Sequence, residues 1–109
     1  MTQYDKEFEF YVGPATHLEG ASLAIDGTAR IDGKIVGKVS VKHLIVGEDG
    51  IVQGDISGET ATIEGTVEDT LSLTGKLTVC STGRIRGKIQ YGSIQTEEGA
   101  KLIGEITTD

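Results

Sequence analysis

A repeat of 17 residues runs through most of this 109-residue chain and constrains its fold more than any other feature. Glycines mark the repeat at steps of 17, 17, 33 and 17, and Leu71 stands where one glycine is missing. A single deletion between Leu73 and Leu77 brings the columns of apolar residues into the same register. Repeats of this kind are typical of solenoids, in which each coil packs only on its neighbours. The glycines are Gly20, Gly37, Gly54, Gly87 and Gly104.

The pattern within each repeat indicates β-strands. Candidate inward residues fall at every second position, as in Ile35, Gly37 and Val39, and this is the period of a strand. Many of these residues are β-branched, which favours strands further. We therefore expect an all-β protein, a single-stranded parallel β-helix (β-solenoid) with about six rungs of about 16–17 residues. The predicted core ladders contain Ile35, Val39, Val52, Ile56, Leu73, Ile85 and Ile89, and on the opposite side Leu44, Ile63, Leu77 and Ile94.

The outward positions of the predicted strands are polar. One column places Lys38 over Asp55 and Lys88 over Glu105. Opposite charges at the spacing of stacked strands contribute roughly 0.2–1 kcal/mol per pair. The same column has Ser72 between its two charge pairs, and the next outward column places Ser57 over Thr74 and Gln90.

The composition excludes several classes of protein. The net charge is −7 and no basic run occurs, so the chain lacks the cations that neutralise nucleic-acid phosphates. No apolar run approaches the roughly 18 residues of a membrane-spanning helix, and the acidic start does not follow the order of a signal peptide. The single cysteine, Cys80, cannot form an internal disulfide. We therefore expect a cytoplasmic protein that does not bind nucleic acid.

Three segments are expected along the chain, divided by the only proline, Pro14. Residues 1–15 form an aromatic and acidic segment, residues 16–106 the solenoid, and residues 107–109 a short end. In the first segment Phe8, Phe10 and Val12 alternate with polar or aromatic neighbours. They are expected to cap the open end of the solenoid; the alternatives are contact with a membrane or a partner, and disorder.

The last rung is expected to lack a cap. The repeat pattern continues to Ile106, and three residues follow it. An uncapped rung presents unpaired backbone groups and apolar side chains to a second chain. We therefore predict self-association through the terminal rungs. The candidate contact residues are Leu18, Leu102, Ile103 and Ile106.

The sequence offers no catalytic constellation and predicts neither a metal nor another cofactor. His17 and His43 are the only histidines, whereas zinc sites in proteins usually need three or four ligands. Cys80 has no histidine near it in sequence to act as a base. Glu64 and Glu97 occupy related positions with Cys80 between them, too far apart to share a proton. These residues are interpreted as a solvated surface, and the protein is not expected to be an enzyme.

Several stretches in a fixed order resemble a known family. They read IDGKIVG (31–37), LIVGEDGIVQGDI (44–56), IEGTV (63–67), LTVCSTGRIRGKI (77–89) and EEGAKLIGEI (97–106). In order, spacing and common step, the stretch from about Leu18 to Ile106 is similar to the bactofilins, polymer-forming bacterial cytoskeletal proteins. The resemblance implies a right-handed, three-sided β-helix. It also implies filaments that form without nucleotide, beneath the cytoplasmic membrane, and that recruit cell-envelope proteins.

Two functions remain open at this point. The first is a structural polymer in which solenoids join end to end and serve as a scaffold for cell-shape or cell-envelope proteins. The second is a non-polymerising solenoid that binds a partner. An ice-binding solenoid is a further alternative, although Ile45 and Gln95 interrupt the column of Thr62 and Thr78.

Overall fold

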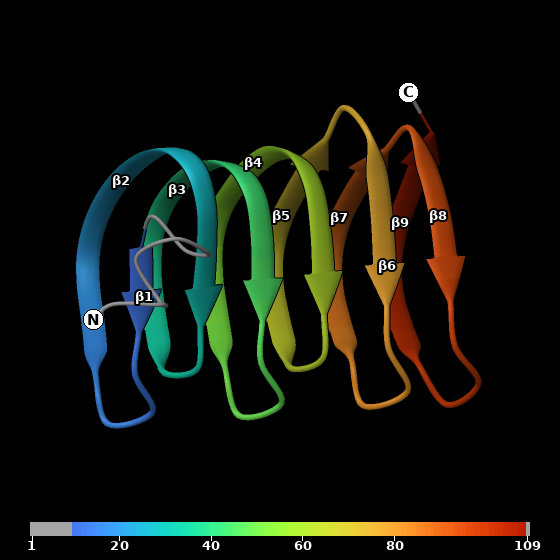
Figure 1. Ribbon diagram of the computed structural model, residues 1–109. Helices are drawn as coiled ribbons and strands as arrows, with labels where there is room; N and C mark the ends of the chain where they lie inside the picture. Colours follow the sequence, from blue (N-terminus) through green and yellow to red (C-terminus); the bar gives the residue numbers. More distant parts are fainter. Residues whose placement is uncertain (1–9, 109) are drawn as a thin grey trace.

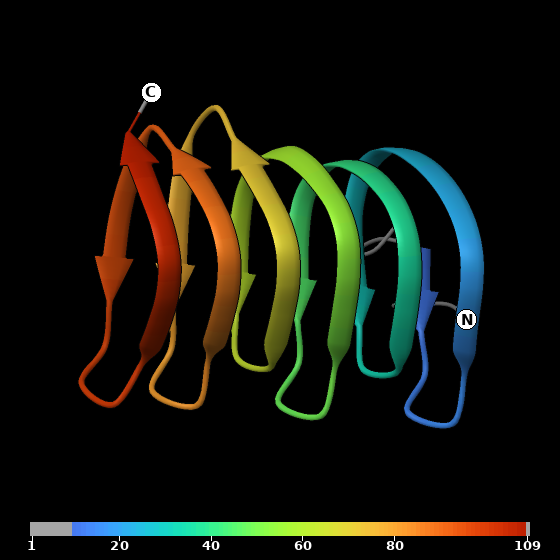
Figure 2. The same cartoon turned by 180° about the vertical axis from the view of Figure 1, so that it is seen from behind.

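The computed structural model describes residues 10–108, and every regular element in that range is a β-strand. Residues 1–9, with the predicted cap residue Phe8, lie outside the described part, as does residue 109. All strand pairs are parallel and wind into a rod, with β1 and β2 at one end and β8 and β9 at the other (Figures 1 and 2). The strands are β1 (Phe10–Val12), β2 (His17–Ile31), β3 (Lys34–Val46), β4 (Ile51–Ile63), β5 (Thr66–Leu73), β6 (Lys76–Val79), β7 (Arg84–Tyr91), β8 (Ser93–Thr96) and β9 (Lys101–Thr108).

The rod is a β-solenoid of about six turns, as the repeat predicts. Each full rung has three consecutive segments, which in β3 are 34–36, 38–41 and 43–46. A column of residues with positive φ bends the chain between the first two segments; Gly54, for example, has φ +120°. A Cβ atom there would lie 2.0 Å from the carbonyl oxygen of Gly37 in the rung beside it. Glycine therefore allows successive rungs to approach closely at this bend.

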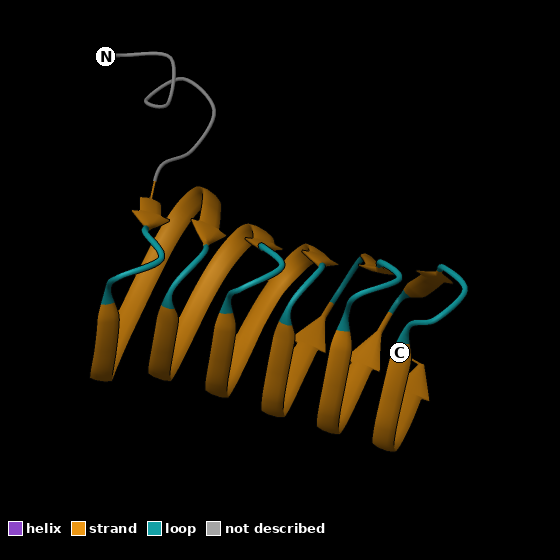
Figure 3. Ribbon diagram, turned by 90° about the horizontal axis from the view of Figure 1, so that it is seen from below, coloured by secondary structure: helices purple, strands orange, loops and turns teal. Residues whose placement is uncertain are grey.

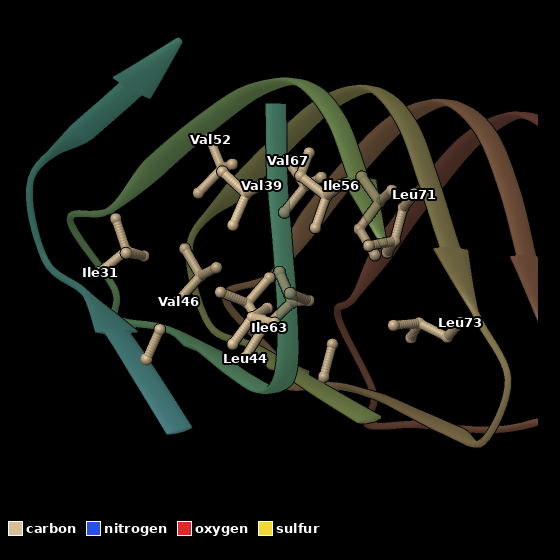
Figure 4. Packing of buried hydrophobic residues seen from close by; sticks show 14 of the residues in the cluster. Ile31, Val39, Leu44, Val46, Val52, Ile56, Ile63, Val67, Leu71 and Leu73 are labelled. Atoms are coloured by element: carbon tan, nitrogen blue, oxygen red, sulfur yellow. The ribbon is translucent and has the colours of Figure 1, made fainter. Parts of the chain in front are cut away.

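Aliphatic side chains stacked in ladders fill the interior (Figure 4). Ile35 lies beside Val52, and Leu44 beside Ala61. Among the described residues, no polar or charged side chain is buried. Each predicted ladder residue except Ile94 is buried; Ile94 is half-buried because, among the described strands, β8 has a partner on one side only.

The fourth rung does not have the predicted register. Leu71, and not Leu73, lies between Ile56 and Ile89 in the ladder. Leu73 is buried, but it stands beside Gly58 at the second bend. The glycine column is continued by Asp69 rather than by Leu71.

The outward columns of that rung shift in the same way. Thr70, and not Ser72, lies between Asp55 and Lys88. Ser72, and not Thr74, is the ladder partner of Ser57. In the neighbouring rungs, Lys38 pairs in register with Asp55 and Lys88 with Glu105, as predicted.

The physical reason for the shift is a difference in turn length. The turns that lead from the third segment into the next rung run along one edge of the rod (Figure 3). A turn of two residues, 64–65, precedes β5 and shortens this rung. One extra residue between Leu73 and Leu77, where a deletion was predicted, partly compensates, because their ladder partners Gly58 and Ala61 are three residues apart and Leu73 and Leu77 are four. The turn that follows β6, 80–83, has four residues. Four-residue turns are also found at 13–16, 47–50 and 97–100, and a second two-residue turn at 32–33. The longer turns extend beyond the shorter ones (Figure 1).

The first rung also departs from the predicted register. A bulge between Glu19 and Ala21 sets Gly20 outside the ladder. Ala21 consequently stands beside Gly37, and Leu23, not Ser22, beside Val39. The predicted glycine column is therefore wrong at its first position, because this rung contains an extra residue.

Candidate functional site at the ends of the solenoid

The end of the rod formed by β8 and β9 has an open backbone edge. Among the described strands, β8 pairs only with β6 and β9 only with β7. The outer N–H and C=O groups of these two strands are therefore available to another strand. Such an edge is a template for parallel or antiparallel pairing with a second chain.

Apolar side chains line the same end. Ile106 stacks on Ile89 in a core ladder, yet 42% of its surface is exposed because no described strand lies beyond β9. Leu102 stacks on Ile85 in the same way and is half-buried. Extending the ladders by one more rung would bury the 42% of Ile106 that is exposed, which contributes roughly 0.6–1.3 kcal/mol.

Ile103 lies on the side of the rod and not on its end. It is the outward neighbour of Leu102, it stands beside Arg86, and 55% of its surface is exposed. The structure thus brings two of the candidate residues, Leu102 and Ile106, together at the end and places the third on a lateral face.

The opposite end is formed by β1 and by the first part of β2. Leu18, the fourth candidate, is half-buried there and stands beside Ile35. Leu23 and Ile25 are also half-buried against the core and extend the apolar surface. Sequence reasoning missed Leu23 and Ile25, because the bulge at Gly20 moves the inward positions of this rung by one residue.

Two of the three predicted cap residues can be placed. Val12 is 2% exposed and stands beside Ile31, so it belongs to the core of the first rung. Phe10 is half-buried and packs against that core. The short strand β1 therefore covers the third segment of β2, and the other two segments of β2 have no outer partner within residues 10–108.

The residues considered for metal binding or catalysis, His17, His43 and Cys80, lie apart from one another. His17 begins the first segment of its rung, and His43 lies on the third, where its Nδ1 is 2.6 Å from Thr60 Oγ1. Cys80 is half-buried in a turn, and burial raises the pKa of its thiol, with added contributions from Glu97 and Glu64. A raised thiol pKa disfavours the reactive thiolate.

Within residues 10–108, no group of three or more His, Cys, Asp or Glu side chains is placed to hold a metal ion. The same range contains no helix long and apolar enough to cross a membrane. On the third segment, Ile45 and Gln95 stand at the two ends of the column that contains Thr62 and Thr78. The threonine ladder is therefore two rungs long.

Comparison with known proteins identifies one family. The family model described as bactofilin, polymer-forming cytoskeletal, matches residues 10–107, which is almost the whole described solenoid. Neither the curated proteins nor the solved structures contain a match.

Proposed function

Because the chain belongs to the bactofilin family of polymer-forming cytoskeletal proteins, we propose that it assembles end to end into filaments through its terminal rungs. The observation that carries the proposal is the end formed by β8 and β9, where an open backbone edge coincides with exposed Ile106 and half-buried Leu102. Pairing of that edge with a second copy satisfies the backbone groups and extends the aliphatic ladders at once.

The proposed joint uses backbone hydrogen bonds and buried aliphatic surface, and neither requires a bound nucleotide or metal. Leu18, Leu23 and Ile25 supply the matching apolar surface at the other end. We propose that the filaments lie in the cytoplasm at the inner face of the membrane, where their sides serve as a scaffold for cell-envelope proteins. The description of the family as polymer-forming and cytoskeletal supports the filament itself.

The test replaces Ile106 by lysine and follows filaments by high-speed sedimentation and negative-stain microscopy. Because 42% of the Ile106 surface is left to bury at the joint, loss of that burial alone weakens each joint by roughly 0.6–1.3 kcal/mol. The concentration needed for assembly should therefore rise about threefold to tenfold. Ile103→Lys is the matched control, since Ile103 is at least as exposed but lies on the side of the rod; this variant should retain filaments.

Circular dichroism should show that both variants keep their strands. Filaments that persist in Ile106→Lys and Leu102→Lys at wild-type concentrations would contradict assembly through this end. A wild-type chain that stays monomeric at all concentrations would favour a non-polymerising binding scaffold instead.

A further inference from the structure

A basic groove lies on the side of the rod and reaches its last strand, β9. It has a volume of about 340 Å³ and runs over the first segments of β5, β7 and β9. Arg84 stands beside Lys101, and Arg86 beside Ile103, whose side chain is exposed. A copy joined at the edge of β9 would stand beside Lys101 and Ile103 and leave the lateral face over β5 and β7 open. Its lining is Thr66, Glu68, Arg84, Ile85, Arg86, Lys101 and Ile103.

The positive charge of this groove is only partly balanced within the described chain: Arg86 stands beside Glu68 in the ladder, whereas Arg84 stands between Thr66 and Lys101. No carboxylate of residues 10–108 is within ion-pairing distance of Arg84, Arg86 or Lys101. The one carboxylate in the lining, Glu68, accepts a hydrogen bond of 2.7 Å from the side-chain amide of Gln53. Arg84 and Lys101 are like charges directly opposite each other on adjacent strands and repel one another, so an anionic partner with an apolar contact for Ile103 would be favourable.

The chain itself carries a surface of the complementary charge. The four-residue turn 47–50 presents two exposed carboxylates, Glu48 and Asp49, and is closed by a hydrogen bond of 2.9 Å from Gly50 N–H to Gly47 O. Because the turns on either side have only two residues, this one projects from the edge of the rod (Figure 1). Neither carboxylate has an ion-pair partner among the described residues.

The turn and the groove lie along the same side of the rod. The turn leads directly into the first segment of β4, and the groove covers the first segments of the following rungs. The ladders fix the turn between β3 and β4, so it cannot fold onto the groove of its own copy. In two rods placed side by side and antiparallel, each turn meets the groove of the other copy, because a two-fold contact repeats itself.

We propose that a second copy of this chain occupies the basic groove and contacts it through turn 47–50, so that neighbouring filaments associate laterally. The inference rests on the proposed function, since a filament repeats a weak charged contact many times and so raises its effective strength. Exposed ion pairs contribute little singly and are screened by salt. The lateral contact is therefore strong only between assembled filaments and only at low ionic strength.

The experiment reads filaments and lateral contacts separately. High-speed sedimentation collects single filaments, low-speed sedimentation collects lateral bundles, and negative-stain microscopy identifies both. At low salt, the double variants Arg84→Glu/Arg86→Glu and Glu48→Arg/Asp49→Arg should each lose the low-speed pellet and keep the high-speed pellet. The chain with all four substitutions should regain the low-speed pellet, because the charges are exchanged between the two surfaces.

The matched control is Lys42→Glu/Lys76→Glu, which changes the net charge by the same amount at exposed positions outside the groove; it should keep both pellets. Bundles that survive in either double variant, or that do not return with four substitutions, would overturn the lateral contact. Single wild-type filaments at low salt would overturn it too. Absence of the high-speed pellet from the wild-type chain would instead contradict the filament proposal.

Discussion

At the residue scale, Asp69 shows how strictly the repeat constrains each position. Within residues 10–108 it is the one non-glycine residue with positive φ, at +88°. It stands in the glycine column between Gly54 and Gly87. Such a conformation costs a residue with a side chain roughly 1–3 kcal/mol, although aspartate tolerates it better than most.

We expect Asp69→Gly to stabilise the fold by about 0.5–1 kcal/mol, because relief of backbone strain exceeds the extra flexibility that glycine gives the unfolded chain. Gly87→Ala should have the opposite sign, since its Cβ would lie 2.0 Å from Asp69 O. Urea unfolding followed by circular dichroism, in the Ile106→Lys background to avoid filaments, measures both changes. A lower midpoint for Asp69→Gly would show that the carboxylate stabilises this bend.

The thiol of Cys80 provides a second prediction at this scale. Burial raises its pKa, and the charges of Glu97 and then Glu64 raise it further. Glu97→Gln removes one of these negative charges and keeps an oxygen that can accept the hydrogen bond from Ser81 N–H, so the thiol pKa should fall. The pH profile of alkylation by iodoacetamide should therefore move to lower pH. Glu98→Gln, in the same turn, is the control that should leave the profile in place.

The raised thiol pKa also gives stability a pH dependence of known sign. The folded thiol keeps its proton to a higher pH than the unfolded thiol, so the unfolded state binds fewer protons above the ordinary thiol pKa of about 8.5. Stability should fall as the pH rises through that value. Between about pH 7.5 and 10, the melting temperature of the wild type should fall by more than the melting temperature of Cys80→Ser. If the melting temperatures of the two proteins changed in parallel with pH, the raised pKa of the Cys80 thiol would be contradicted.

At the element scale, the length of the turns sets the register of the rungs. Ser57 and Ser72 are ladder neighbours, and stacked strands lie about 4.8 Å apart, within the range that a disulfide can join. Ser57 and Thr74 would be neighbours in a uniform repeat. In the observed register their Cα atoms are about 8 Å apart, beyond disulfide reach.

We therefore predict that Ser57→Cys/Ser72→Cys, in a Cys80→Ser background, forms an internal disulfide on mild oxidation. The closed loop has about 15 residues, for which a stabilisation of about 3 kcal/mol is expected. Thiol titration and non-reducing electrophoresis measure the bond, and the melting temperature measures its effect. Ser57→Cys/Thr74→Cys is the matched pair that should keep free thiols. If a disulfide formed in that pair alone, the uniform register would be correct and the observed one wrong.

The fold could be predicted from sequence because most rungs repeat without interruption. The regular spacing of Gly37, Gly54 and Gly87, with β-branched residues on either side, predicts parallel strands stacked in a solenoid. The register of the fourth rung could not be predicted. Turn 64–65 has two residues where turns 47–50 and 80–83 have four, and the stretch from Leu73 to Leu77 is one residue longer than its counterpart in β4, so the sum resembles one deletion.

Local pattern could not resolve that ambiguity. Leu71 and Leu73 are both apolar and two residues apart, so either satisfies strand alternation in the same ladder. At the candidate site, the pattern predicted Leu102 and Ile106, which follow the repeat, but missed Leu23, which follows a bulge. The charge of the lateral groove depends on which outward residues stack, and only the ladder register reveals that Arg84 and Lys101 are neighbours.

At the scale of the whole molecule, net charge and local charge act in opposite directions. Copies with a charge of −7 repel one another, and salt screens this repulsion with a Debye length of about 8 Å at 0.15 M. End-to-end assembly, which depends on apolar burial, should strengthen between about 20 and 150 mM salt. The lateral contact between groove and turn should weaken over the same range.

Sedimentation across a salt series checks this prediction in one experiment. The high-speed pellet should grow while the low-speed pellet shrinks. Two pellets that rise and fall together would mean that one interaction governs both kinds of assembly.

The turns also make the rod suitable as a display platform. Turn 80–83 is closed by a hydrogen bond of 2.8 Å from Gly83 N–H to Cys80 O, and Ser81 and Thr82 at its tip are exposed. A peptide epitope inserted between Ser81 and Thr82 would leave every interior ladder in place. Tagged copies could then be imaged by fluorescence or labelled with antibody without disturbing the ends at which the rods join.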